Sequence, residues 1–343
     1  MSEAPLPARS PAPGLHDRAV SPILAGGALR VPSCVICGAE EALPRFEVEG
    51  IAQRVVVCSG CGLGSLYPLP SDAEIRAFYP DDYYGEPGVK FQGAVEKLVR
   101  WIGERHLGFL SQGLPRGARI LDVGCGRGVI LGALADRGFE VHGQEISAQA
   151  ARGADPRAEI RIAESLAAAG YPPAFFDQVV IWHVLEHLRD PRAALLEAQR
   201  ISRAGARLIV AVPNFSSLQS RWSGAAWFHL DLPRHLYQFP LRALRELLAR
   251  TGFEVESEHH FSLRQNPFGW IQSALNRVQG LPRNGLYQLL HERPAAGAAP
   301  YTLGVRVWLR ALLVLGVAPA LAMTLLEAWL RSGATVHLVA TRK

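Results

Sequence analysis

The strongest constraint on this chain is a strand-sized apolar run followed by glycines at alternate positions. The glycines are Gly124, Gly126 and Gly128. Residues 120–123 before them read as a buried strand, and residues 129–134 after them begin a helix. Glycine accepts the left-handed backbone of a tight turn without strain, so a strand, a turn and a helix explain this order. Residues 139–145 then predict a second strand, and the whole predicts a βαβ unit with a ligand site at its strand ends.

Two acids decide which ligand suits this loop. Asp122 lies at its mouth, and Glu145 ends the second strand 23 residues later. A dinucleotide site has the spacing G-x-G-x-x-G, whereas this loop has G-x-G-x-G. A carboxylate repels a pyrophosphate but attracts an ammonium or sulfonium group, and S-adenosylmethionine carries both cations and no phosphate. We predict S-adenosylmethionine, with the Glu145 carboxylate on the ribose hydroxyls; the alternatives are a nicotinamide or flavin cofactor, or a turn that binds nothing.

Four cysteines form a second motif, with two C-x2-C pairs separated by 20 residues. They are Cys34, Cys37, Cys58 and Cys61. Two such pairs can place four thiolates around a tetrahedral Zn²⁺, and four ligands leave no open position for catalysis. With strands expected at residues 45–49 and 53–58, the segment 32–70 predicts a zinc ribbon with a structural ion. The alternative is four reduced cysteines without a metal.

Charge and composition limit the partners. The formal net charge is only +5, and residues 32–70 contain two arginines and no lysine, so we predict no nucleic-acid partner. Hydrophobic residues make up 49% of the chain, enough for a large core. Residues 1–31 contain no apolar block typical of a secretory signal, and we expect a flexible tail and a cytoplasmic protein. Residues 71–118 predict a connector and a helix over 89–113.

The segment from 119 to 342 resembles the class I S-adenosylmethionine-dependent methyltransferases, near the group that includes sugar-modifying and ubiquinone-type enzymes. The matching runs are residues 120–128, 176–191, 208–214 and 231–237. The cysteine module, followed by paired prolines, is also similar to the amino-terminal module of some of these enzymes. The resemblance implies an α/β, Rossmann-like, seven-stranded sheet with one reversed edge strand, in a methyltransferase domain over 119–343.

Periodicity supports the remaining strands of this sheet. We expect them at residues 160–163, 177–182, 207–212, 253–261 and 335–341. Helices are expected from Pro191 to about 202 and over 241–250.

Several residues near the expected strand ends are candidates for the site. The resemblance implies an acid near Glu164 for adenine, and His183 beside the cofactor. Glu164 has the alternative of a solvated loop acid. Glu186 and His187 follow His183, and one alternative is that both only hold the next helix in place. We saw no carboxylate–histidine cluster that suggests a catalytic divalent ion.

Residues 213–240, here named the lid segment, are too many for an idle connection in a compact domain. Arg234 is suited to bind a phosphate or carboxylate, and His235 to take a proton from an acceptor hydroxyl. We predict His235, His187 and Arg234 as catalytic residues. The alternative is that Asp231 and Arg234 pair only to brace the segment.

The carboxy-terminal segment 302–332 contains a 16-residue run without charge, residues 311–326. That run is shorter than the roughly 20 residues of a spanning helix and contains Pro319, so we expect a helical hairpin that does not cross a membrane. Residues 302–343 contain five basic residues and one acid. The hairpin is expected either to rest on the inner face of an anionic membrane, or to be buried on the sheet or in a homodimer interface.

These observations predict methyl transfer from S-adenosylmethionine to a small-molecule acceptor, with a saccharide or a lipid-linked intermediate favoured by analogy alone. One alternative is a non-catalytic membrane-associated or scaffold protein that retains the fold. A further alternative is an NAD-dependent dehydrogenase.

Overall fold

The structure is a computed structural model, which describes residues 27–48, 50–78, 108–290 and 301–343. Three predicted features therefore fall wholly or mostly outside the described residues. They are the tail 1–31, the helix over 89–113 and a loop that the low-complexity sequence of residues 293–300 predicts.

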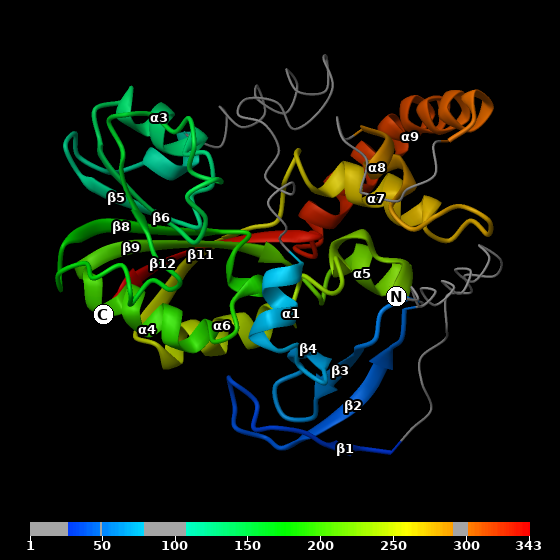
Figure 1. Ribbon diagram of the computed structural model, residues 1–343, viewed down its shortest axis with the longest axis horizontal. Coiled ribbons are helices and arrows are strands. Elements are labelled where there is room, and N and C mark those ends of the chain that lie inside the picture. Colours follow the sequence, from blue (N-terminus) through cyan, green and yellow to red (C-terminus); the bar gives the residue numbers. More distant parts are fainter. Residues whose placement is uncertain (1–26, 49, 79–107, 291–300) are drawn as a thin grey trace, which may run out of the picture.

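Within the described part, a seven-stranded sheet has the order β11-β12-β9-β8-β5-β6-β7 (Figure 1). Neighbours are parallel except β12, which is antiparallel to both β9 and β11. The strands are β5 (Arg119–Val123), β6 (Glu140–Glu145), β7 (Glu159–Ile162), β8 (Phe176–Trp182), β9 (Ser202–Pro213), β11 (Phe253–His259) and β12 (Thr335–Arg342). The strand order reverses at β5, because β6 and β7 follow on one side of it and β8 and β9 on the other. In an open α/β sheet, such a reversal leaves a ligand crevice between the two central strands, at their carboxyl ends. This confirms the predicted fold class.

The reversed strand is not at the edge, so that expectation was wrong. β12 lies between β9 and β11, and β11 takes the edge. Composition explains the order: six successive residues of β12 are buried, whereas β11 has an acid at alternate positions. Edge strands tolerate charged side chains that a central strand cannot bury.

Successive side chains along each strand point to opposite faces of the sheet, and they pack into two separate apolar layers. Leu121, Val179 and Val210 face one layer, and Ile120, Val180 and Ile209 the other. The helices beside these strands are α3 (Val129–Ala135), α4 (Pro191–Ile201) and α6 (Leu241–Arg250). The Asp190 side chain accepts from the amide of Ala193 and caps α4, with Pro191 in the first turn. The last two helices lie where the sequence predicted them.

The cysteine module forms a second, antiparallel sheet with the order β1-β2-β3-β4-β10. Its strands are β1 (Leu29–Arg30), β2 (Glu41–Phe46), β3 (Arg54–Cys58), β4 (Gly64–Tyr67) and β10 (Tyr237–Gln238). α1 (Asp72–Ala77) follows, and its Ser71 forms a capping box with Glu74. The strand expected at 45–49 instead starts at Glu41, because Ala42 must pair with Cys58 close to the cysteines.

The lid segment connects the two sheets. It contains α5 (Leu218–Ser223), two short 3₁₀ turns, and β10, which pairs antiparallel with β4. Leu236 accepts a hydrogen bond from the amide of Leu66 at 3.0 Å, and its own amide donates to the carbonyl of Glu186 at 2.9 Å. Trp227 and Leu230 are fully buried, and one apolar cluster runs from the cysteine module into the seven-stranded sheet. The lid segment is therefore a buried part of the fold rather than an open flap.

The carboxy-terminal segment differs from the expected hairpin. Residues 303–329 form one continuous helix, α9 (Leu303–Trp329), with Pro319 inside it. α7 (Asn266–Leu275) and α8 (Gly285–Leu290), which the sequence analysis did not predict, pack beside it through Ile271, Leu286 and Leu309. Among the described helices, α9 alone is long and apolar enough to cross a membrane by length and composition. The length argument from the uncharged run was therefore wrong, because the helix extends beyond both ends of that run.

We expect Gly64→Ala to destabilise the junction between β4 and the lid segment. A Cβ atom at Gly64 would lie 2.7 Å from Cβ of Gln238, whose backbone is paired with it. Overpacking of this kind costs about 1–3 kcal/mol of unfolding free energy. Urea denaturation measures the change. Gly27→Ala is the control, because nothing lies within 4 Å of its Cβ position; equal stability of both variants would contradict the packing argument.

Candidate functional site

The glycine loop adopts the backbone that its sequence predicts. Gly124, Gly126 and Gly128 all have positive φ, at 68°, 51° and 62°. Glu145, at the end of β6, closes the loop: one carboxylate oxygen accepts from the amide of Gly126 at 2.9 Å and the other from the amide of Ile146 at 2.8 Å. The sequence analysis assigned Glu145 to the ribose hydroxyls only. Each carboxylate oxygen has two acceptor sites, so support of the loop and contact with a ribose are compatible.

Asp122 is the second-to-last residue of β5, beside this loop, and is 5% exposed. Burial and the negative charge of Glu145 raise its pKa to about 7. A group that carries a positive charge would reverse this shift, because it favours the ionised carboxylate. At Gly126 nothing lies within 4 Å of a Cβ position, so the described part of the chain leaves space beside the loop. This space and the two carboxylates fit a cationic nucleoside such as S-adenosylmethionine.

His183 directly follows β8, whose carboxyl end lies beside that of β5. Its φ is +53°, which is rare for a residue other than glycine and is concentrated at functional sites. The next residue, Val184, packs on the loop so closely that a Cβ atom at Gly124 would lie 2.6 Å from it. The Nδ1 atom of His183 lies 3.3 Å from a carboxylate oxygen of Glu186. The segment after β8 therefore connects the loop to a second polar cluster.

That cluster consists of Glu186, His187 and His235, whose ligand atoms all lie within 4.8 Å of one another. The expectation that the chain has no carboxylate–histidine cluster was therefore wrong. Glu186 and His187 come from a 3₁₀ turn after β8, while His235 comes from the lid segment 48 residues later. Only the fold brings them together.

Hydrogen bonds orient both rings of the cluster. Nδ1 of His235 bonds to the carbonyl of His229 at 2.9 Å, and Nδ1 of His187 to the carbonyl of Arg234 at 3.1 Å. A carbonyl only accepts, so Nδ1 of each ring carries the proton and the neutral ring has its lone pair on Nε2. Nε2 of His235 lies 4.0 Å from Glu186 and 3.7 Å from Asp231.

Burial sets the charge of these groups. It lowers the pKa of His235, together with the neighbouring His187, to about 4, so this ring is neutral at pH 7. Burial also opposes ionisation of Glu186, but the hydrogen bond from His183 and the nearby histidines outweigh it and lower the pKa of Glu186 to about 2. One carboxylate oxygen of Glu186 is buried without a hydrogen-bond partner. A neutral imidazole beside carboxylates can accept a proton, and the same donor set has the composition of a divalent-cation site.

The positions of three further predicted residues test the alternatives given for them. Arg234 pairs with Asp231 at 2.5 Å, as the bracing alternative expected. Glu164 is exposed just beyond β7, and its adenine role stays a prediction. Glu186 does not hold the following helix, because its side chain faces His183 and His235 while Asp190 caps α4.

One neighbour of the site had no signal in the sequence. Gln265 begins α7, and its side-chain nitrogen lies 3.5 Å from Nε2 of His183. These two residues are 82 positions apart, and no motif includes Gln265. Sequence reasoning misses such a residue because its relevance comes from packing alone.

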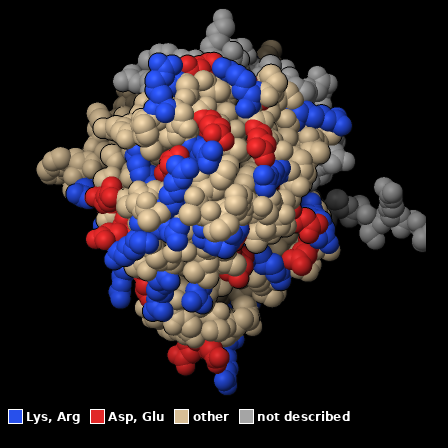
Figure 2. Space-filling model, turned by 90° about the vertical axis from the view of Figure 1, so that its left-hand side faces the viewer, with Lys and Arg blue, Asp and Glu red and all other residues tan. Residues whose placement is uncertain are grey.

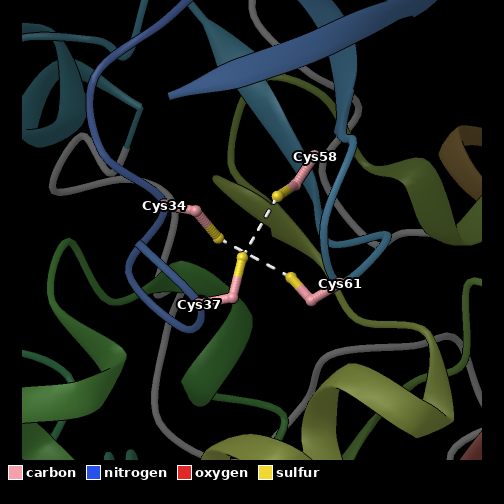
Figure 3. A group of neighbouring side chains, drawn as sticks. All are labelled: Cys34, Cys37, Cys58 and Cys61. Carbon is pink, nitrogen blue, oxygen red and sulfur yellow. Dashed lines mark hydrogen bonds between the residues drawn. The ribbon is translucent and has the colours of Figure 1, made fainter. Parts of the chain in front are cut away.

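The four cysteines converge as predicted (Figure 3). The sulfur atoms of Cys34 and Cys61 are 3.7 Å apart, and those of Cys37 and Cys58 are 3.5 Å apart. Zn–S bonds of about 2.3 Å in a tetrahedron place sulfur atoms about 3.8 Å apart, so this donor set fits Zn²⁺ closely. All four are free thiols rather than disulfides.

Comparisons with known proteins agree with this geometry. Residues 96–258 match a family described as a methyltransferase domain. A ubiquinone biosynthesis O-methyltransferase of Xylella fastidiosa is 30% identical over 156 residues, which cover 42% of this chain and 63% of that protein. The enzyme of that name from Alkalilimnicola ehrlichii is 36% identical over 129 residues, covering 34% of this chain and 51% of that protein. The matches thus span less than two thirds of either relative.

A solved structure of an S-adenosylmethionine-dependent methyltransferase from Archaeoglobus fulgidus is also similar. It shares 18% sequence identity with a TM-score of 0.46, and the alignment covers 71% of this chain and 94% of that chain.

We expect the protein to purify with about one equivalent of zinc bound by the cysteines. Cys37→Ser should remove it and loosen β10, because the module holds the lid segment through β4. Elemental analysis measures the metal, and proteolysis of the lid segment measures the loosening. Cys125→Ser, which changes a buried cysteine outside the cluster, is the control. Far less than one equivalent in the wild type would reject the zinc assignment.

Affinity for S-adenosylmethionine should depend on pH through Asp122. Its raised pKa of about 7 leaves it largely protonated at pH 6, and a protonated carboxyl does not attract the cationic ligand. Binding should tighten roughly five- to tenfold between pH 6 and pH 7.5. In Asp122→Asn it should be weaker and nearly independent of pH. Calorimetric titration measures both, with the exposed Asp136→Asn as control; a pH dependence that persists in Asp122→Asn would refute this role.

Proposed function

We propose that this chain, which matches a methyltransferase-domain family over residues 96–258, transfers a methyl group from S-adenosylmethionine to a small-molecule acceptor. The observation that carries the proposal is the short chain segment that joins two clusters. The glycine loop with Asp122 and Glu145 is suited to the methyl donor, and Val184, two residues before Glu186 of the histidine–carboxylate cluster, packs directly against that loop. A donor site and a proton-accepting site thus adjoin at the ends of β5 and β8.

The residues of the loop bind and orient the donor. Glu145 holds the backbone of Gly126 in place, and the ionised Asp122 attracts the positive charge. When bound, S-adenosylmethionine supplies a methyl group on a sulfonium centre, and transfer requires in-line approach of the acceptor. The protein's contribution is alignment of the acceptor and exclusion of water, which in well-oriented systems accounts for much of the rate.

His235 is the proposed general base. Nδ1 already donates a hydrogen bond to the carbonyl of His229, so Nε2 is the atom that takes a proton from the acceptor. Glu186 and Asp231, at 4.0 and 3.7 Å, would stabilise the imidazolium ion that forms. His187 stacks edge-on against His235, with ring centres 4.6 Å apart, and is the second candidate. Arg234, held by Asp231, remains a candidate for an acidic group of the acceptor.

The acceptor class rests on analogy. The relatives from Xylella fastidiosa and Alkalilimnicola ehrlichii are named as ubiquinone biosynthesis O-methyltransferases, which favours a hydroxyl acceptor. We propose a saccharide or a lipid-linked intermediate. The cysteine module is proposed to bind a structural Zn²⁺, and its free thiols favour a reducing, cytoplasmic location. A non-catalytic protein that retains the fold is the alternative, whereas an NAD-dependent dehydrogenase receives no support from the matched family.

Incubation of a cell extract with the protein and isotopically labelled S-adenosylmethionine should label one acceptor, which mass spectrometry identifies. With that acceptor, His235→Gln should lower kcat by a factor of about 10² to 10⁴, because proton transfer contributes this much, and leave donor affinity within about twofold. His259→Gln, on the edge strand β11, is the matched control.

Two results would count against the proposal. Donor binding without any labelled product would favour the non-catalytic alternative. Full activity of His235→Gln would remove this histidine as the base while leaving methyl transfer itself intact.

A further inference from the structure

The outer face of α9 is apolar along its whole length. Of the 18 large apolar side chains exposed in the described part of the chain, ten lie between residues 303 and 330. Val314 and Leu315 are each 73% exposed, and Leu325 is 61% exposed. An outward helix face in a soluble protein normally has charged residues, so this face is typical of a helix that contacts an apolar phase.

The opposite face of α9 packs against the rest of the protein. Leu309, Ala320, Thr324 and Glu327 are buried, and α7 packs along it. Glu327 accepts hydrogen bonds from the Trp270 indole and the amide of Ala334. The chain then continues directly into β12 of the central sheet. Because one face is bound to α7 and one end to the sheet, the helix cannot cross a bilayer without losing these contacts, and only its outer face is available.

The ends of the apolar face have the groups that favour a lipid surface. Trp308 and Trp329 are 44% and 79% exposed and stand 21 residues apart, about 30 Å along the helix. Tryptophan is enriched at the interface between lipid and water. Arg306 and Arg310 are exposed beside this face. Arginines beside an apolar helix face complement anionic headgroups.

Figure 1 shows α9 beside α7 and α8, running from the sheet to the right-hand end of the molecule. The opposite side of the molecule, which faces the viewer in Figure 2, carries charges of both signs scattered over its surface. Ten of the 18 exposed large apolar side chains of the described residues thus gather at the end of the protein that α9 forms. A bilayer can cover that end while the site between the two sheets stays with the remainder of the molecule.

We propose that α9 docks this protein on an anionic lipid bilayer, with the helix lying in the plane of one leaflet and its outer face among the upper acyl chains. The docking surface consists of Leu303, Val307, Val314, Leu315, Leu325 and Trp329, with Arg306 and Arg310 at the headgroups. The proposal is independent of methyl transfer, because none of these residues belongs to the catalytic or donor-binding clusters.

Flotation of the full chain with lipid vesicles tests the proposal. The protein should float with phosphatidylcholine vesicles that contain about one third phosphatidylglycerol and bind pure phosphatidylcholine at least several-fold more weakly. The double substitution Val314→Glu and Leu325→Glu should weaken binding at least tenfold. Arg306→Gln with Arg310→Gln should remove most of the preference for the anionic vesicles. Ile162→Glu, at a 48% exposed apolar residue on β7, is the matched control and should float like the wild type.

Two further measurements keep the result interpretable. Each variant should keep the melting temperature and donor affinity of the wild type, since the changed side chains point to solvent. Lipids brominated near the headgroup should quench Trp329 more than lipids brominated at the chain ends, measured as the difference between the wild type and Trp329→Phe. Stronger quenching from the chain ends would overturn the in-plane arrangement.

Absence of vesicle binding, or binding that the two glutamates leave unchanged, would overturn the proposal. Analytical sedimentation of the protein without lipid tests whether the chain forms a dimer through α9 instead. A dimer that the same two glutamates dissociate, in a protein that does not float, would show that a second copy of the chain covers α9 instead of lipid.

Discussion

The site depends on two backbone hydrogen bonds at one residue of the lid segment. Leu236 donates to the carbonyl of Glu186 on one side and accepts from the amide of Leu66 on the other. Through them, the cysteine module, the lid segment and the turn after β8 become one rigid unit, and the buried apolar cluster that crosses all three reinforces it. His235 is the neighbour of Leu236, so its position beside Glu186 follows from these bonds. The module thereby has a physical role even though no catalytic group lies in it.

Electrostatics divides the crevice into two parts with different tasks. On the loop side, two acids lie close together in a buried place, which raises the pKa of Asp122 and creates a site that a cation would stabilise. On the lid side, an ionised Glu186 lies beside a neutral His235, whose Nε2 has the lone pair that can take a proton. Val184 joins the parts by packing on Gly124, where no side chain would fit. A cationic donor and a neutral acceptor thus have adjoining places with complementary charge.

The carboxy-terminal helices add a surface of a different kind. α9 buries one face against α7 and leaves an exposed apolar face on the other side, which is the surface that we propose lies on lipid. The same helix leads into β12, whose insertion between β9 and β11 completes the sheet. The proposed docking surface is therefore part of a helix that leads directly into the central sheet.

The sequence by itself determined the local features. Alternate glycines required left-handed turns, the apolar runs became strands, and the cysteine spacing brought four sulfurs together, because each depends on backbone preference or short-range periodicity. Long-range contacts decided the rest. The meeting of Glu186 with His235, the place of β12 inside the sheet, and the joining of β10 to the cysteine module depend on residues far apart in the chain, and no local pattern encodes them. Likewise, the charge of the segment 302–332 could not show which face of α9 is buried, since both of its faces are apolar and only packing against α7 distinguishes them.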